Sequence, residues 1–326
     1  MPNLFDLLLQ LRQTQVPIGQ ADIGCGQALG AAGLLRDHLL DRLARPAAAR
    51  HHALDLQGHA AVDHQHRIDL RAPTARLDQQ RHIKDDASAR LRLQHLFFRL
   101  GDLVGRSSPT DHHFAITTLF EIMEVGARAD LKTDVLKDLE KQKHALAAYR
   151  GNPAISEEAL EQVIGQLDAC FTALKGQPGK PGHALTEIDW LMSLRSRASI
   201  PGGTCEFDLP VYHAWRHLEA GQRRADLKRW VDGFLPLAES VGLLLKLLRD
   251  SGVPQKVMCS GGHFQQNLPQ GRSFGLLRLR IDPQLGLFPE ISGNRLVVSV
   301  RLMTIVDGQR VQSSSEDAQL EVTLCS

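Results

Sequence analysis

Residues 237–254 read Leu-Ala-Glu-Ser-Val-Gly-Leu-Leu-Leu-Lys-Leu-Leu-Arg-Asp-Ser-Gly-Val-Pro, and the apolar periodicity of the chain changes at this point. Residues 237–248 form the most apolar helical segment, and Gly252 and Pro254 are typical of the residues that end a helix. Beyond Pro254, apolar residues recur at every second position instead of every third or fourth. The stretch therefore predicts a boundary between a helical part and a strand part.

Upstream of this boundary, apolar residues at helical spacing predict a series of helices that starts near residue 91. Ser108, followed by a proline, and Ser156, followed by two glutamates, each place a capping hydroxyl before a first helical turn. Asp130 and Thr186 stand at two further expected helix starts. We expect a helical domain over residues 86–253.

Downstream of the boundary, the pattern predicts strands. Leu277, Leu279 and Ile281 alternate with two arginines, and residues 296–303 and 320–324 alternate in the same way. Asp307 followed by glycine is a hairpin signal. One apolar and one polar face per strand predict an antiparallel sheet packed on the helices. The expected fold class is α+β, with a helical domain followed by an antiparallel β-sheet domain at residues 254–326.

The composition limits the class of protein. The chain has 326 residues, enough for two domains, and 43% of them are hydrophobic. No apolar run reaches the ~18 residues that span a bilayer, and the N-terminus lacks the features of a signal peptide. The 5 cysteines are scattered, which favours reduced thiols in the cytoplasm. A net charge of +1 does not indicate a nucleic-acid-binding protein. We expect no membrane insertion.

Residues 1–85 differ from the rest of the chain. The first lysine is Lys84 and the first glutamate is Glu121, although arginine, aspartate, alanine and histidine are abundant before them. Lysine and glutamate are among the commonest residues of soluble proteins. GC-rich DNA translated in a wrong frame gives such a composition. We interpret residues 1–85 as an N-terminal extension that is non-native or disordered.

Two patterns inside this extension suggest enzyme or metal chemistry. Asp22-Ile23-Gly24-Cys25-Gly26 is similar to the glycine loop of S-adenosylmethionine-dependent methyltransferases, which is the alternative reading of the chain as an enzyme. Residues 17–21 make a poor strand before it, and no alternation of strands and helices follows to build a parallel sheet. Six histidines between residues 51 and 82 suggest a metal site, but no cysteine partner stands at ligand spacing. We therefore expect no enzyme, no cofactor and no metal.

Residues 199–215 read Ser-Ile-Pro-Gly-Gly-Thr-Cys-Glu-Phe-Asp-Leu-Pro-Val-Tyr-His-Ala-Trp. Pro-Gly-Gly predicts a turn with positive φ, and Pro210 predicts a first helical turn. The string closely resembles the signature of the ZapD family of bacterial cell-division proteins. Other segments match the family in order: Leu-Arg-Leu-Gln at 91–94, and residues 119–122, 131–139, 277–279, 288–293 and 300–303. The resemblance covers residues 83–326.

This resemblance implies a function that composition alone does not give. Members of the family bind FtsZ and form symmetric dimers, so the chain is expected to bind the FtsZ C-terminal tail. As a homodimer it would cross-link FtsZ filaments into bundles at the division septum. The expected location is the cytoplasm, concentrated at the mid-cell division ring. The apolar segment 237–248 could serve either the core or the dimer interface.

Basic residues are the candidate partner-binding site, because arginine pairs well with carboxylates. We expect the arginines at 278, 280 and 301 to share the polar faces of neighbouring strands, without acidic neighbours. Each residue could instead be a solvated charge. Cys205 and His213 could also act as a catalytic nucleophile and its base. The alternative is that Cys205 is a small structural thiol beside the turn. The candidates are Arg92, Arg195, Arg197, His213, Arg278, Arg280 and Arg301.

Overall fold

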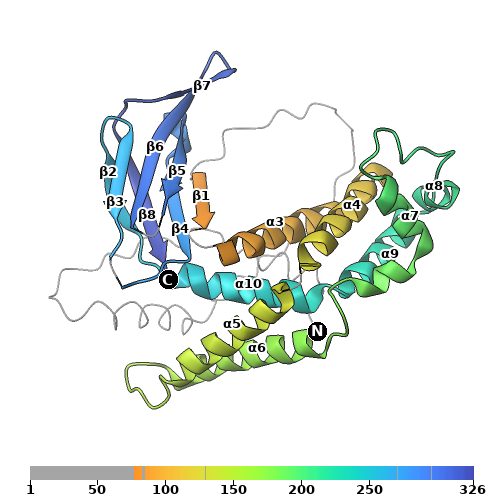
Figure 1. Ribbon diagram of the computed structural model, residues 1–326, viewed down its shortest axis with the longest axis horizontal. Helices are drawn as coiled ribbons and strands as arrows, with labels where there is room; N and C mark the ends of the chain where they lie inside the picture. Colours follow the sequence, from red (N-terminus) through yellow and green to blue (C-terminus); the bar gives the residue numbers. More distant parts are fainter. Residues whose placement is uncertain (1–76, 83–84, 129, 270, 295) are drawn as a thin grey trace, which may run out of the picture. The chain divides into compact units, whose positions relative to one another are not determined.

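The structure is a computed structural model that describes residues 77–82, 85–128, 130–269, 271–294 and 296–326. The chain divides into two compact units. Among the described residues, a helical unit spans Asp85–Arg249, and a strand unit joins residues 77–82 to Asp250–Ser326 (Figure 1). The α+β fold class and the order of its two parts are confirmed.

The helical unit consists of helices joined by loops, the longest of which connects α7 and α8. They are α3 (Asp85–Gly105), α4 (Pro109–Gly126), α5 (Leu131–Ala147), α6 (Glu157–Gly176), the 3-10 helix η1 (His183–Glu187), α7 (Asp189–Arg197), α8 (Pro210–Arg216), α9 (Ala220–Asp232) and α10 (Leu235–Asp250).

Local side-chain chemistry sets several helix starts. The Ser108 hydroxyl accepts a hydrogen bond from the amide of Thr110, and the Ser156 hydroxyl accepts one from the amide of Ala159, so both predicted caps are confirmed. Asp130 stands at the expected N-cap of α5 without a side-chain bond. The prediction for Thr186 was wrong, because its hydroxyl donates to the His183 carbonyl within η1, and α7 begins three residues later.

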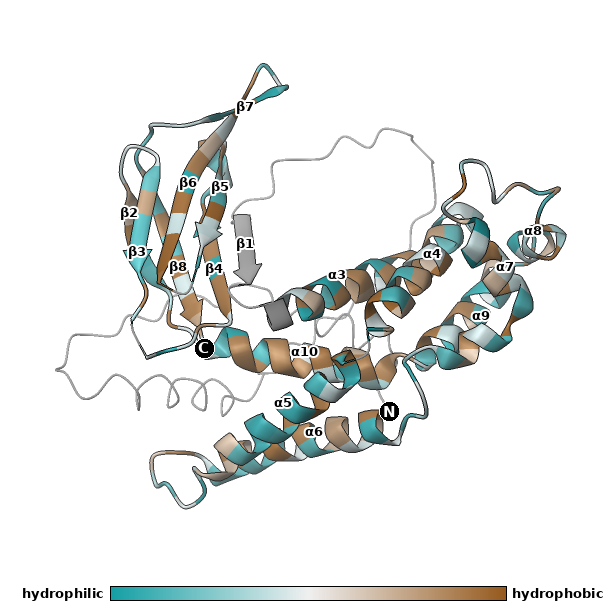
Figure 2. Cartoon of the chain, in the orientation of Figure 1, coloured by the Kyte–Doolittle hydropathy of each residue, from teal (hydrophilic) through white to brown (hydrophobic). Residues whose placement is uncertain are grey.

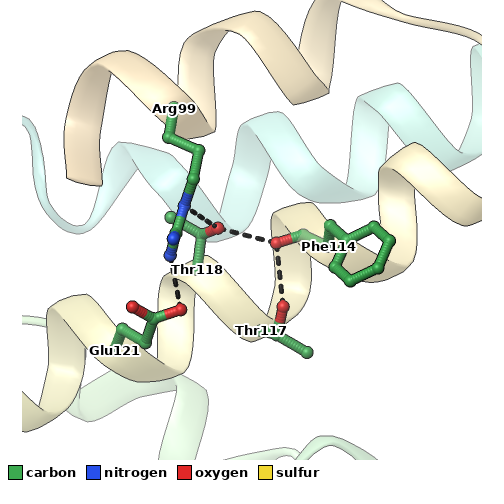
Figure 3. Close-up of polar contacts among 5 residues, drawn as sticks. All are labelled: Arg99, Phe114, Thr117, Thr118 and Glu121. Carbon is green, nitrogen blue, oxygen red and sulfur yellow. Dashed lines mark hydrogen bonds and ion pairs between the residues drawn. The ribbon is translucent and has the colours of Figure 1, made fainter. Parts of the chain in front are cut away.

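A polar contact holds α3 against α4 (Figure 3). Arg99 Nε donates to the Thr118 hydroxyl over 3.0 Å, and its guanidinium forms an ion pair with Glu121. The hydroxyls of Thr117 and Thr118 both donate to the Phe114 carbonyl, while the Phe114 ring points away from this network. The contact ties the middle of α4 to α3, and Phe114, one turn before Thr118, remains exposed.

The apolar residues of α10 belong to the core of the protein. Six of them are buried within the chain, and the helix is largely apolar along its length in Figure 2. These residues are Leu237, Ala238, Val241, Leu244, Leu245 and Leu247. Of the two roles that the sequence left open for this segment, core packing therefore accounts for the buried residues.

The strand unit contains two antiparallel sheets instead of the single sheet that we expected. One has the order β1-β4-β8-β2; the other has the order β3-β6-β5, with β7 paired to β6. The strands are β1 (Leu77–His82), β2 (Gln255–Cys259), β3 (His263–Asn267), β4 (Leu276–Ile281), β5 (Leu287–Gly293), β6 (Val297–Val306), β7 (Arg310–Ser313) and β8 (Ala318–Cys325).

The core of this unit lies between the two sheets. Leu277 and Leu279 of β4 and Leu320 of β8 pack with Val298 and Val300 of β6 in one apolar cluster. Alternate residues of β4, β6 and β8 belong to this cluster, as the period of 2 predicts. The prediction of an antiparallel sheet is thus right about strand direction but wrong about sheet number, because alternation identifies the buried face and not the element that covers it.

Strand β1 lies inside the range that we interpret as an extension. Its residues pair antiparallel with β4, from Leu77 opposite Ile281 to His82 opposite Leu276. The sequence predicted no strand here, so the structure departs from a disordered extension at this range. The non-native origin of residues 1–85 stays a prediction. Asp22-Ile23-Gly24-Cys25-Gly26 and the histidines between 51 and 76 lie outside the described residues.

Within the described ranges, no helix combines the length and the apolar character needed to cross a membrane.

Candidate functional site

Residues 198–209, which include the Pro-Gly-Gly motif, form a loop of consecutive turns between α7 and α8. The amides of Ile200, Gly203 and Asp208 donate to the carbonyls three residues before them, over 2.9, 2.9 and 3.2 Å. Gly203 is required, because a Cβ there would lie 2.6 Å from the Arg197 carbonyl oxygen. Gly202 adopts φ 70°, in the left-handed region that favours glycine. The loop is therefore held by its own backbone.

An ion pair closes this loop at its base. Arg197, the last residue of α7, lies 3.2 Å from the carboxylate of Asp208, which precedes α8 by two residues. Arg195 is half-buried, and no ion pair is found for it among the described residues. Of the two predicted arginines before the turn, Arg197 is thus paired with a carboxylate of the loop, and Arg195 is not.

The loop displays apolar side chains that sequence patterns did not identify. Phe207 is 85% exposed, and Ile200 and Val211 are also more than half exposed. We define the α7–α8 loop surface as Arg195, Ile200, Phe207, Val211 and His213. It combines three apolar side chains with two groups that can carry positive charge.

A cluster of aromatic rings packs around α8, the helix that carries Val211 and His213. Tyr212 and Trp215 lie one turn apart on α8 and are buried, with ring centroids 6.3 Å apart. Trp190 of α7 lies 5.8 Å from Trp215, and Trp230 of α9 lies 5.7 Å from it. The three tryptophans of the chain therefore form one packed cluster that fixes the position of α8.

Tyr212 also links the loop surface to α4. Its hydroxyl is hydrogen-bonded to Nδ1 of His113, whose ring lies 5.4 Å from the exposed Phe114. Burial raises the pKa of Tyr212 to about 12. Burial and the nearby Arg216 guanidinium lower the pKa of His113 below its ordinary value of 6.5. The hydrogen bond therefore joins two neutral side chains at neutral pH.

His213 has neighbours that argue against a Cys-His catalytic pair. Its Nδ1 lies 3.6 Å from the carboxylate of Glu206, and its ring lies 4.3 Å from that of His217. No hydrogen bond joins His213 to Cys205 in the described part of the chain. No group of three or more metal-ligating side chains occurs among the described residues. The carboxylate nearest to His213 is thus that of Glu206, and the ring is not paired with Cys205 in the described part of the chain.

Arg92 is exposed on α3 and is not brought to this loop surface. The loop that follows α3 contacts α9, since the Ser107 carbonyl accepts a hydrogen bond from Arg223. Arg92 lies on the same helix about 20 Å before that point, at 1.5 Å of rise per residue. The structure therefore separates Arg92 from Arg195 and His213.

The prediction that three arginines of the strand unit share the polar faces of neighbouring strands, without acidic neighbours, was wrong in two respects. Arg278 and Arg280 belong to β4, whereas Arg301 belongs to β6 in the other sheet. Acidic neighbours are also present: Arg280 pairs with its cross-strand partner Glu321 at 2.9 Å, and Arg301 lies 3.8 Å from its cross-strand partner Glu290. Alternation along one strand does not reveal which strand lies beside it, and this caused the error.

The fold defines a two-unit α+β protein in which consecutive turns between α7 and α8 hold exposed apolar side chains. The family model for the ZapD cell-division protein matches residues 91–301. The "Cell division protein ZapD" of Janthinobacterium sp. (strain Marseille) is 42% identical over 236 residues, which is 72% of this chain and 94% of that relative. The chain belongs to the ZapD family of cell-division proteins.

Proposed function

We propose that this protein is an adaptor of the bacterial division ring that binds the C-terminal tail of FtsZ through the α7–α8 loop surface. Membership of the family supports a role in cell division. The observation that carries the proposal is the exposure of Phe207: the side chain is 85% exposed in a loop of consecutive turns. Burying such a side chain is worth about 1.5–3 kcal/mol, so a partner that covers it gains affinity at one point.

The chemistry of the surface fits a short peptide with an apolar side chain and carboxylates. Phe207, Ile200 and Val211 offer apolar area, and Arg195 supplies a guanidinium that no carboxylate of the described chain neutralises. Because the turns fix the loop before binding, little conformational entropy is lost when the peptide docks. Arg197 acts by holding Asp208, and so contributes to the shape of the loop.

The other basic candidates differ in how much we expect them to contribute to binding of the tail. Arg92 is an exposed cation at a separate place on the helical unit, where a longer tail segment could contact it. Arg280 and Arg301 have a glutamate beside them, so their charge is partly compensated within the chain. We therefore assign the main charged contact to Arg195. His213, which has Glu206 beside it, and Arg92, Arg278, Arg280 and Arg301 are assigned secondary contacts.

As a homodimer, the protein would present two tail sites and bundle FtsZ filaments. A single tail contact of micromolar strength holds little, but two linked contacts can raise the apparent affinity by roughly 10²–10⁴. Filaments display many tails, so each dimer can join two of them. This activity would place the protein in the cytoplasm, at the mid-cell division ring.

The test measures the affinity of a labelled FtsZ tail peptide by fluorescence anisotropy. Phe207→Ser and Arg195→Glu are each expected to weaken binding about tenfold, because each removes one desolvated or charged contact. Lys141→Glu is the matched control, since it makes the same charge change at an exposed residue of α5. It should leave the affinity within about twofold.

Thermal unfolding of each variant separates binding from folding. Phe207 is so exposed that its replacement by serine should change the free energy of unfolding by less than about 0.5 kcal/mol. A folded Phe207→Ser variant that binds the tail peptide as tightly as the parent would refute the proposed site. No binding by the parent protein would refute the proposed partner.

A further inference from the structure

Strand β4 has an apolar edge that another strand covers. β4 lies between β8 and β1 in its sheet, and β1 pairs with it antiparallel along its full length (Figure 1). Leu277, Leu279 and Ile281 of β4 belong to the apolar cluster between the two sheets. Residues directly opposite them on the neighbouring strand stand on the same face of the sheet, so they belong to the row beside that cluster.

The outer strands β2, β3 and β5 carry residues that discourage pairing with a further strand. Lys256 of β2 is exposed, and β5 contains Pro289. β3 carries three side-chain amides and a histidine. Charged residues and proline are typical of edge strands that stay unpaired. β4 has buried apolar residues instead, and its edge is paired.

The sequence of β1 does not suit the edge that it covers. In the register of the pair, Gln79 stands opposite Leu279, and Arg81 stands opposite Leu277. Both positions lie in the row beside the apolar cluster, where an apolar, β-branched residue is favoured over a polar one. Of the three positions in this row, only that of Leu77 holds an apolar residue. β1 is therefore a weak occupant of an apolar edge.

The two strands also differ in their relation to the family. The family model matches residues 91–301, which include β4 and begin after β1. The edge thus belongs to the family part of the chain, whereas the strand that covers it lies outside that part. An edge that pairs with a strand from outside the family part supplies the main-chain hydrogen-bonding groups that strand addition requires.

We propose that the side of β4 that faces away from β8 is a docking site for an extended peptide of a partner protein, and that β1 occupies this site in cis. The peptide adds antiparallel to β4 and places apolar residues opposite Leu277, Leu279 and Ile281. Opposite Arg278 and Arg280, an uncharged or acidic residue fits, because like charges directly opposite each other on a sheet are destabilising. The inference is independent of the proposed tail site, which lies in the helical unit.

The test measures binding of a labelled peptide by fluorescence anisotropy. The peptide has the sequence of residues 75–84 with Gln79→Val and Arg81→Val. Because β1 is tethered to the same chain, it competes with the peptide at a high effective concentration, so the parent should bind weakly. The unaltered peptide should bind about tenfold more weakly than the altered one, since it keeps the two polar residues.

Two full-chain variants change the occupancy of the site in opposite directions. Gln79→Pro with Gln80→Pro should release β1, because proline cannot donate to the ladder, and should tighten peptide binding about tenfold. Gln79→Val with Arg81→Val should hold β1 more firmly, raise the melting temperature and weaken peptide binding below that of the parent. Ala60→Pro with Ala61→Pro is the control for the first variant, since it places two prolines outside β1, and it should bind like the parent.

Hydrogen exchange locates the bound peptide. In the released variant, the peptide should slow exchange of the β4 amides and leave those of β2, at the opposite edge of the same sheet, unchanged. Protection at β2 instead of β4 would overturn the inference. It would also fail if a released variant with a cooperative thermal transition bound the peptide no better than the parent. A valine variant that melts no higher than the parent and binds the peptide equally well would overturn it without any need to release β1.

Discussion

Arg223 donates its Nε proton to Nδ1 of His112 over 2.9 Å, and both side chains are buried. The remaining nitrogens of Arg223 donate to the carbonyls of Ser107, Arg216 and Leu218. One guanidinium therefore joins α9, the loop before it, and the start of α4. This network positions α8, and with it the α7–α8 loop surface.

Arg223→Lys should destabilise the helical unit by about 2–4 kcal/mol. A lysine ammonium is a compact donor that cannot reach all four acceptors, so buried acceptors would lose their partners. Arg224→Lys is the control, because the Arg224 guanidinium makes one exposed bond to the Ser107 hydroxyl. It should change stability by less than about 0.5 kcal/mol in urea unfolding. Equal effects of the two substitutions would contradict the role of Arg223.

The same pair makes stability depend on pH. Burial lowers the pKa of His112 below 6.5, and the Arg223 guanidinium lowers it further, while the hydrogen bond from Nε2 to the Arg106 carbonyl acts in the opposite direction. As pH falls through about 6.5, the unfolded chain takes up protons that the folded chain does not. Stability should therefore be complete above that pH and fall below it, until the folded-state pKa is passed.

His112→Gln tests this dependence, because glutamine can accept from Arg223 and donate to a carbonyl without titrating. His113, whose pKa is also lowered, contributes a similar slope and remains in the variant. The free energy of unfolding is measured between pH 7.5 and 5. Each histidine contributes at most about 1.4 kcal/mol per pH unit, so the variant should show a shallower slope. An unchanged slope would exclude His112 as its source.

The Pro-Gly-Gly turn gives a prediction about the loop surface. Gly203→Ala would place a Cβ 2.6 Å from the Arg197 carbonyl oxygen and 2.8 Å from Ile200 Cβ, so the turn must shift. We expect a loss of about 1–3 kcal/mol in stability and a weaker tail affinity. Gly221→Ala is the control, since nothing lies within 4 Å of the new Cβ in α9. It should leave tail affinity unchanged and raise stability by up to about 1 kcal/mol.

Helix starts and the fold class could be predicted because their causes are local. Ser108 and Ser156 cap the helices that follow them, and the change in periodicity after Pro254 separates helices from strands. Strands β2 and β3 could not be predicted, because they are short, and β3 carries three amide side chains and a histidine. The exposure of Phe207 arises from turns without periodicity, so no sequence pattern marked it.

Truncation tests the N-terminal extension at two points. Removal of residues 1–76 keeps β1, so the melting temperature and tail affinity should match those of the full chain. Removal of residues 1–82 leaves β4 without its antiparallel partner and exposes a sheet edge. That variant should melt lower or aggregate on heating. A large loss of stability in the first truncation would contradict the interpretation of the extension, and identical melting of both would show that β1 contributes nothing.

Salt distinguishes cross-linking from binding to a single filament. Each bridge between filaments needs two charge-assisted tail contacts at once, so screening weakens a bridge twice and a single contact once. Bundles, followed by light scattering with FtsZ and GTP, should therefore dissolve at a salt concentration at which the tail peptide still binds in anisotropy. FtsZ alone, sedimented at each salt concentration, controls for loss of the filaments themselves. Bundles that persist after tail-peptide binding has been abolished would show that the α7–α8 loop surface does not make the bridges, and would leave a contact along the filament body as their cause.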